Sequence, residues 1–320
     1  MAQQTMPHSL TPYPSPTQRE TELDWLVGRL GGEIHTYGHS VQGRPLRVAH
    51  IPAHRPTAHA VLICANIHGV EFVSSRVALS VLRQLPSLSL LEQTAVWVAP
   101  CLNPDGYART WECEGQASLA ALRCNANGVD LNRNFPMPWN ARPGRLPFTG
   151  ARHPGKATHR GRAPGSEPEV AALMTLLEQV RPHAGVNLHS FMGTIIQPKL
   201  THWSDHRQYS HLIAALRGGQ RGGHRYSRLA FPPLDVFTGE QEDYQHHIMR
   251  CWSVCLETFP VSHSLRQSSP SRSIFWRFNP TEPQKWIHQD VAGIAAFLHA
   301  ALSMPRPPRR PGAAEHRLTW

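Results

Sequence analysis

Long hydrophobic runs are missing from this sequence of 320 residues, and none approaches the roughly 18 to 20 apolar residues that a membrane-spanning helix needs. Cysteine is also scarce, with no CxxC pair and too few residues for a disulfide framework. The first twenty residues lack the basic start and apolar run of a secretory signal. We therefore expect a cytoplasmic protein without a membrane partner, and reduced, mostly buried cysteines at positions 64, 101, 113, 124, 251 and 255.

Acidic residues are few as well: 22 Asp and Glu stand against 32 Lys and Arg, for a net charge of +10. Two segments, residues 140–165 with a charge of +6 and residues 304–320 with +3, carry nearly all of it. Both are rich in Pro and Gly, which favours a loop and a tail over a nucleic-acid-binding surface, so we expect no nucleic-acid partner. The loop is either simply solvated or a positive rim for an anionic substrate. Its basic residues are Arg142, Arg145, Arg152, Lys156, Arg160 and Arg162.

Strand-like and helix-like patterns alternate along the chain, which predicts an α/β fold with helices covering a mostly parallel or mixed sheet. The sequence Ser166-Glu167-Pro168-Glu169 predicts a helix with Ser166 as N-cap in a capping box. We expect one domain over residues 21–303, with flexible tails at 1–20 and 304–320. The strands are expected at 45–52, 59–65, 94–100, 184–190 and 251–258, and the helices at 70–85, 166–180, 205–217 and 282–302.

Three candidate metal ligands lie where apolar strands end. His68 and Glu71, in the sequence HGVE, follow the strand HAVLICA, and His189 closes the apolar strand AGVNLHS. Ligands bind at the carboxyl edge of open α/β sheets. Two His and one Glu with an open fourth position are the composition of a catalytic zinc site. A lone His at position 189 would more simply be a satisfied core residue, but here it accompanies two other ligands.

Two further elements carry chemistry. Glu257, in CLETFP, ends another apolar strand, and in a dry environment it could act as general base to a zinc-bound water and then as proton donor to a leaving amine. The segment NGVDLNRNFP packs Asp130, Asn132 and Arg133 together without an amphipathic period. Arg offers a planar fork for a carboxylate, and Asp can orient a metal-bound His. This segment therefore predicts a binding loop.

The ordered motifs HGVE, NPDG, NGVDLNRNFP, SEPE, NLHS and LETFP, over about residues 45–300, resemble the zinc metallocarboxypeptidases of the carboxypeptidase A superfamily. The resemblance implies an eight-stranded mixed α/β/α sheet and one catalytic zinc. It implies that His68, Glu71 and His189 bind zinc and that Glu257 is the general base. It further implies that Asn132 and Arg133 grip the substrate's terminal carboxylate, that Asp130 orients the first zinc His, and that Arg123 stabilises the oxyanion.

The chain departs from this family at one place. Members usually carry a mobile Tyr some twenty residues before the catalytic Glu, and here residues 233–240 read PLDVFTGE. Phe237 could occupy that place, or Tyr226 or Tyr244 could reach in. Loss of this phenol would weaken hydrogen bonding to the substrate but would leave the zinc ligands and the catalytic Glu in place, so we still expect an active hydrolase.

Within the family, the VDLNRNFP form and the expected lack of a signal peptide resemble the bacterial murein peptide amidases, which split the γ-D-glutamyl bond to meso-diaminopimelate in cell-wall recycling. The expected partner is thus a small anionic peptide. A cationic rim at residues 140–165 would suit its carboxylates, and the acidic residues Glu240, Glu242 and Asp243 could meet the diaminopimelate amine.

Three alternatives stay open. A general carboxypeptidase would use the same site. An N-acyl amino acid deacylase of the succinylglutamate desuccinylase or aspartoacylase kind shares HxxE and a later His, but it typically places that His closer than the 118 residues that separate Glu71 from His189. A non-catalytic binding protein on a peptidase fold is the third, and the complete set of ligands with Glu257 argues against it. The sequence does not predict the oligomeric state.

Overall fold

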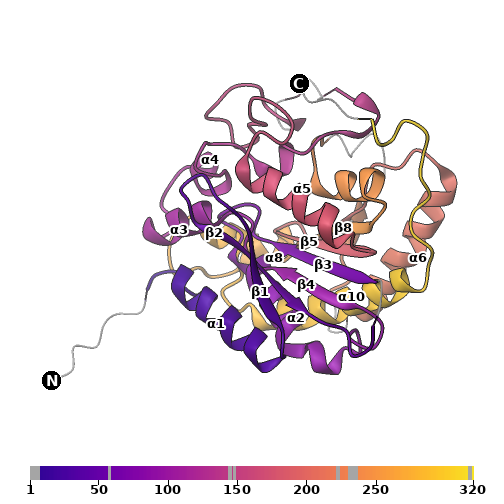
Figure 1. Cartoon of the computed structure of the whole chain (residues 1–320). Coiled ribbons are helices and arrows are strands. Elements are labelled where there is room, and N and C mark those ends of the chain that lie inside the picture. The colour runs from indigo at the N-terminus through magenta and orange to yellow at the C-terminus, as the bar shows by residue number, and fades with distance from the viewer. Residues whose placement is uncertain are drawn as a thin grey trace.

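The computed structural model describes residues 8–56, 59–142, 146, 149–220, 224–229, 237–315 and 319–320. Its centre is an eight-stranded mixed sheet with the strand order β1-β2-β4-β3-β5-β8-β6-β7 (Figure 1). The strands are β1 (Glu33–His39), β2 (Pro45–Ile51), β3 (Ala60–Ala65), β4 (Ala95–Ala99), β5 (Ala184–Ser190), β6 (Thr194–Ile196), β7 (Ser227–Leu229) and β8 (Trp252–Thr258). The expected α/β class and eight-stranded mixed sheet are confirmed.

The four central strands β4, β3, β5 and β8 run parallel, and β2 and β6 join them antiparallel on either side. Every residue of β3 and β5 is buried. Strands covered on both faces need continuous apolar sequence, which AVLICA and AGVNLHS largely supply. Asn187 is a buried polar residue in the middle of β5, whereas His189 and Ser190 lie at its carboxyl end. Because the strands are parallel, their carboxyl ends meet at one edge of the sheet.

The helices lie in two layers on either side of the sheet. In Figure 1, α5 covers one face, and α1, α2 and α10 cover the other. The helices are α1 (Pro16–Arg29), α2 (Phe72–Gln84), α3 (Pro104–Glu112), α4 (Leu119–Arg123), α5 (Pro168–Val180), α6 (Trp203–Gly219), α7 (Gln241–Asp243), α8 (Val261–Arg266), α9 (Phe275–Phe278) and α10 (Gln284–Leu302). Short 3₁₀ turns cover Leu85–Ser87, Leu131–Arg133 and Pro138–Asn140, and Tyr244–Ile248 forms a π turn. None of these helices is long and apolar enough to cross a bilayer.

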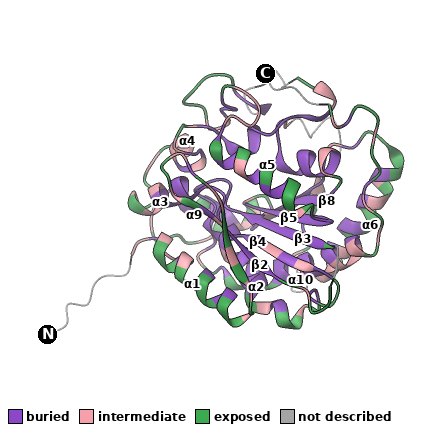
Figure 2. Ribbon diagram, viewed as in Figure 1, coloured by how far each residue is buried: buried purple, intermediate pink, exposed green. Residues whose placement is uncertain are grey.

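Each face of the sheet has its own hydrophobic core. The larger core joins one face to α1, α2, α6 and α10, and the second packs α5 against Val48, Leu62 and Cys64 on the opposite face. The purple strands between partly green helices in Figure 2 show the same arrangement. Burying one such Leu or Val contributes roughly 1.5–3 kcal/mol, so these layers hold the loops at the carboxyl edge of the sheet on a rigid base. All six cysteines are free thiols, as expected.

The start of α5 differs from the prediction. Its N-cap is Glu167 rather than Ser166, and no side chain caps it. The Ser166 hydroxyl instead donates to Glu167 Oε1 at 2.9 Å, and the Glu167 N–H donates to Asn134 Oδ1 at 3.1 Å. The capping-box prediction was wrong because a contact with the distant 131–134 segment, invisible in the local pattern, sets the start of the helix.

Parts of both terminal segments lie against this framework. Near the amino end, Tyr13 donates its hydroxyl proton to the Pro280 carbonyl at 2.7 Å. Near the carboxyl end, Arg306 donates to the Pro182 carbonyl at 2.8 Å, Arg310 forms an ion pair with Asp205, and Ala313 is fully buried. Residues 304–315, expected from their composition to form a loose tail, thus follow the surface through several specific contacts.

Candidate metal centre and peptide-binding site

Three buried donor groups converge at the carboxyl edge of the sheet. His68 and Glu71 lie between β3 and α2, and His189 lies near the end of β5. Glu71 Oε1 is 2.7 Å from His68 Nδ1, and Glu71 Oε2 is 3.2 Å from His189 Nδ1. The two His Nδ1 atoms are themselves 3.2 Å apart. The structure therefore brings all three predicted ligands together.

This donor set fits a zinc ion. Ligand nitrogens about 2.0–2.1 Å from a tetrahedral zinc lie roughly 3.3 Å from each other, close to the observed spacing of the two imidazoles. Burial raises the pKa of Glu71, but His68 and His189 outweigh it and lower the pKa to about 2, so the carboxylate stays charged. Two imidazoles and a carboxylate, each no more than 2% exposed, leave positions for water and substrate.

Asp130 lies directly behind His68. Its Oδ1 is 3.1 Å from His68 Nε2, and its Oδ2 accepts from Arg123 Nε at 2.9 Å. Burial raises the pKa of Asp130, but Arg123 and His68 hold it well below its ordinary value. A charged acceptor at Nε2 places the proton on that nitrogen and leaves Nδ1 free to bind a metal. This is the geometry expected for an acid that orients the first ligand.

The NPDG turn braces the loop that carries HGVE. A Cβ on Gly69 would lie 2.4 Å from the carbonyl carbon of Gly106, so the two backbones touch and position 69 requires glycine. A Cβ on Gly106 would lie 2.7 Å from Asn103 Nδ2. Asn103 accepts from the Gly106 N–H at 2.8 Å and donates to the Ile67 carbonyl at 3.2 Å. The Gly69 N–H also donates to the Arg123 carbonyl at 3.1 Å. These contacts fix Arg123 beside the centre, with Nη1 3.9 Å from Glu71 Oε1.

Glu257 faces the same centre from β8. It pairs in register with His189 on the neighbouring parallel strand. Burial, followed by the negative charge of Glu71, raises the pKa of Glu257 to about 8. One of its carboxylate oxygens, Oε2, is buried without a hydrogen-bond partner among the described residues. A carboxyl group held dry beside a metal centre is suited to take up and return a proton.

Asn132 and Arg133 lie on the 3₁₀ turn after Asp130 and are almost fully buried. Asn132 Oδ1 accepts from the Gln241 N–H at 2.9 Å, which anchors this turn to α7. Arg133 Nη1 lies 3.1 Å from Glu240 Oε1, whereas its Nε has no partner among the described residues. The guanidinium thus keeps donor capacity for a carboxylate.

Phe237, one candidate for the place of the family's mobile Tyr, lies beside Arg133. Its ring lies 4.7 Å from the guanidinium carbon of Arg133. Tyr226 instead donates to Asp290 at 3.3 Å in the core behind β8, and Tyr244 packs against Phe135. Neither tyrosine thus replaces the mobile phenol. Residues 230–236 lie outside the described residues.

The acidic residues Glu240, Glu242 and Asp243 are all buried. Glu240 pairs with Arg133, and Asp243 accepts from the Lys199 N–H at 2.7 Å. Cys255, which the sequence reasoning missed, lies among these groups: burial raises the pKa of its thiol, and so do Glu242 and Glu257. Its place two residues before Glu257 on a strand was the available signal, since alternate residues share a face.

The basic segment is only partly exposed. Arg142, Arg152, Lys156 and Arg162 face solvent, whereas Arg145 lies outside the described residues. Arg160 is 5% exposed and its guanidinium carbon lies 5.1 Å from the centre of the Trp320 ring. The His159 carbonyl accepts from the Asp130 N–H at 2.7 Å, so this segment approaches the site from the side of Asp130.

Comparison with known proteins identifies the class. The zinc carboxypeptidase family model matches residues 32–260, and the chain therefore belongs to this family of metal-dependent peptide hydrolases. The chain is 36% identical over 166 residues to murein peptide amidase A of Escherichia coli K12, an alignment that covers 51% of this chain and 61% of that protein. The chain thus spans less than two thirds of this relative.

Solved structures share the fold over most of the chain. Carboxypeptidase A of Helicoverpa armigera superposes with a TM-score of 0.74 at 19% identity, over 91% of this chain and 74% of that one. Bovine thrombin-activatable fibrinolysis inhibitor superposes with a TM-score of 0.71 at 20% identity, over 91% and 98%. Family membership favours the carboxypeptidase interpretation over the N-acyl amino acid deacylase alternative.

Proposed function

We propose that this chain is a zinc-dependent carboxypeptidase that hydrolyses the amide bond before a substrate's C-terminal residue. The observation that carries the proposal is the register of two parallel strands, which sets Glu257 directly beside His189 and the other two ligands. His68, Glu71 and His189 would hold the zinc. When bound, zinc polarises the scissile carbonyl and lowers the pKa of a coordinated water towards about 7.

The remaining steps belong to side chains of the chain. Arg133, with Asn132, binds the terminal carboxylate and fixes which amide bond meets the centre. Arg123 donates to the carbonyl oxygen as negative charge develops on it. Glu257 removes a proton from the attacking water and delivers it to the leaving nitrogen. Burial raises the pKa of this carboxyl group, which favours its holding the proton between removal from the water and delivery to the leaving nitrogen.

Arg133 meets its substrate with one partner already in place. Glu240 occupies Nη1, which holds the guanidinium plane still and neutralises its charge in the buried site. The side of the guanidinium group that carries Nε stays available for the incoming carboxylate. Glu240 is therefore a positioning residue for Arg133.

For the substrate, we propose the γ-D-glutamyl-meso-diaminopimelate bond of murein peptides. Similarity to murein peptide amidase A supports this choice. Buried Glu242 also supports it, because Glu242 and Glu257 both raise the pKa of the Cys255 thiol between them, and a carboxylate suits the ammonium group of a diaminopimelate side chain. The exposed cations Arg152 and Lys156 suit the several carboxylates of such a peptide.

The test is a mass-spectrometric assay of the purified zinc-loaded chain. The substrates are L-Ala-γ-D-Glu-meso-diaminopimelate, the same peptide ending in norleucine, and ordinary C-terminal peptides. Release of diaminopimelate in strong preference to norleucine, with that preference lost in Glu242→Gln, supports the proposal. Cleavage of only the ordinary peptides identifies a general carboxypeptidase, and cleavage of none contradicts the proposed activity.

A further inference from the structure

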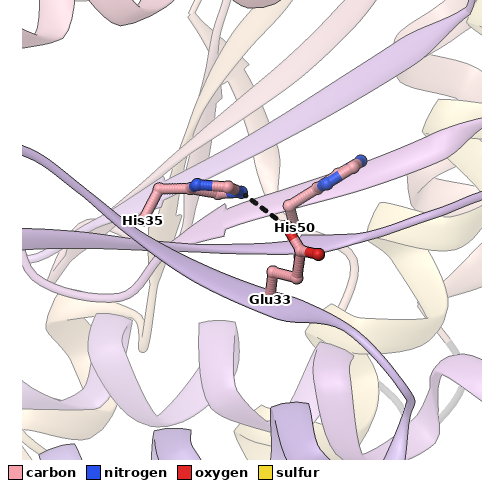
Figure 3. A group of neighbouring side chains, drawn as sticks. All are labelled: Glu33, His35 and His50. Carbon is pink, nitrogen blue, oxygen red and sulfur yellow. Dashed lines mark ion pairs between the residues drawn. The ribbon is translucent and has the colours of Figure 1, made fainter.

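A second cluster of possible metal ligands lies away from the active centre. Glu33 and His35 project from β1, and His50 projects from β2 (Figure 3). The register pairs Glu33 with His50 directly, and His35 lies two residues along on the same face of β1. Each residue offers one ligand atom, and these atoms all lie within 4.8 Å of one another.

Neighbouring groups hold the two imidazoles in place. Trp97 on β4 pairs in register with His50. The Trp97 ring stacks on His50 with centroids 4.2 Å apart and an angle of 18°, and it lies 5.5 Å from the His35 ring at 29°. His35 Nε2 is 3.6 Å from Glu33 Oε2, the ion pair dashed in Figure 3. The rings therefore lose little further freedom when they bind a cation.

We propose that Glu33, His35 and His50 bind a divalent transition-metal ion such as Ni²⁺ or Zn²⁺. Two imidazoles with one carboxylate suit these ions rather than Mg²⁺ or Ca²⁺, which favour oxygen ligands alone. The donor atoms already lie within 4.8 Å of one another, and small side-chain rotations bring them to ligand spacing because Glu33 and His35 are exposed. The open side of the cluster leaves coordination positions to water.

The ion would join two strands of the sheet margin. β1 is the edge strand of the sheet and pairs only with β2 among the described strands. Ligands on β1 and β2 tie the edge strand to the rest of the sheet. The cluster is separate from the active centre, since β4 stands between β2 and the strand β3 that leads to His68. Metal binding here stabilises the fold and does not take part in hydrolysis.

The experiment titrates the full chain, loaded first with one equivalent of Zn²⁺, with NiCl₂ in an isothermal calorimeter. The wild type should bind one additional Ni²⁺ per chain, and His35→Gln should weaken that binding at least tenfold. His54→Gln is the matched control, because His54 is also an exposed His beside a carboxylate, 2.8 Å from Glu92, but belongs to no group of three ligands among the described residues. It should bind Ni²⁺ like the wild type.

Thermal unfolding gives a second readout that needs no hydrolysis. At one hundred times the dissociation constant, Ni²⁺ should raise the Tm of the wild type and of His54→Gln by about 4 °C, and leave that of His35→Gln unchanged. Absence of the additional Ni²⁺, or an equal loss in His35→Gln and His54→Gln, overturns the proposal. Neither result bears on the proposed peptidase activity, which is measured separately.

Discussion

Asp130→Asn tests how the protein prepares its metal centre. Asp130 accepts from three donors at once: His68 Nε2 at 3.1 Å, Arg123 Nε at 2.9 Å and the Asn132 N–H at 3.0 Å. Asn keeps the shape of the side chain but removes its charge and replaces one acceptor oxygen with an NH₂ group. That NH₂ group must then face either His68 or Arg123, both of which are donors here.

The expected loss of zinc affinity follows from these three hydrogen bonds. When a metal-bound His loses the group that accepts a hydrogen bond from its other ring nitrogen, metal affinity typically falls 10–100-fold, which is about 1.4–2.7 kcal/mol. The upper part of that range applies, because Asp130 is fully buried and the variant leaves Arg123 without its charged partner. We therefore expect zinc to bind Asp130→Asn roughly 30–100-fold more weakly than it binds the wild type.

Zinc affinity is measured by competition with a chromogenic chelator at pH 7.5. Asp205→Asn is the matched control, since Asp205 is another buried carboxylate paired with an arginine, Arg310, and it lies on α6 rather than in the loops that carry the three ligands. Both variants should unfold at lower temperature, but only Asp130→Asn should lose zinc affinity. An Asp130→Asn protein that binds zinc as tightly as the wild type would refute the orienting role.

Three further predictions concern binding, pH and metal removal. Arg133→Lys should raise KM for a C-terminal peptide about tenfold or more while kcat changes less, because Lys cannot reproduce the planar guanidinium group. Steady-state kinetics that show an unchanged KM would contradict this prediction. Burial raises the pKa of Asp290 to about 7, so the contribution of Asp290 to the stability of the wild type should fall by about 4 kcal/mol as the pH rises from about 4 to 7. In urea titrations Asp290→Asn should lack that decline, and an equal decline in both proteins would argue against it. Removal of metal with 1,10-phenanthroline should abolish hydrolysis and lower the Tm, and zinc should restore both; activity that survives in metal-free protein counts against a metal centre.

The strands and the metal ligands could be predicted because their signals are local. AVLICA and AGVNLHS are apolar over the full length of a buried strand, and His68, Glu71 and His189 stand at their carboxyl ends. In a parallel sheet this position alone brings them to one edge. The convergence of the three donors followed from the order of elements, without knowledge of any tertiary contact.

Other features depend on contacts between distant parts of the chain. The pairing of Arg133 with Glu240 joins residues 107 positions apart, and the start of α5 depends on Asn134, 33 positions before Glu167. The contact of Phe237 with Arg133 is of the same kind. Each local sequence is compatible with several partners, so only the packed structure selects among them.

The central claim is that Glu257 moves protons at a zinc centre made by His68, Glu71 and His189. The most direct test compares kcat of zinc-loaded wild type and Glu257→Gln on the best substrate, with zinc content measured in the same samples. We expect kcat to fall by roughly 10²–10⁴ while one zinc per chain remains bound. A Glu257→Gln protein that keeps its zinc and hydrolyses the peptide at the wild-type rate would contradict it.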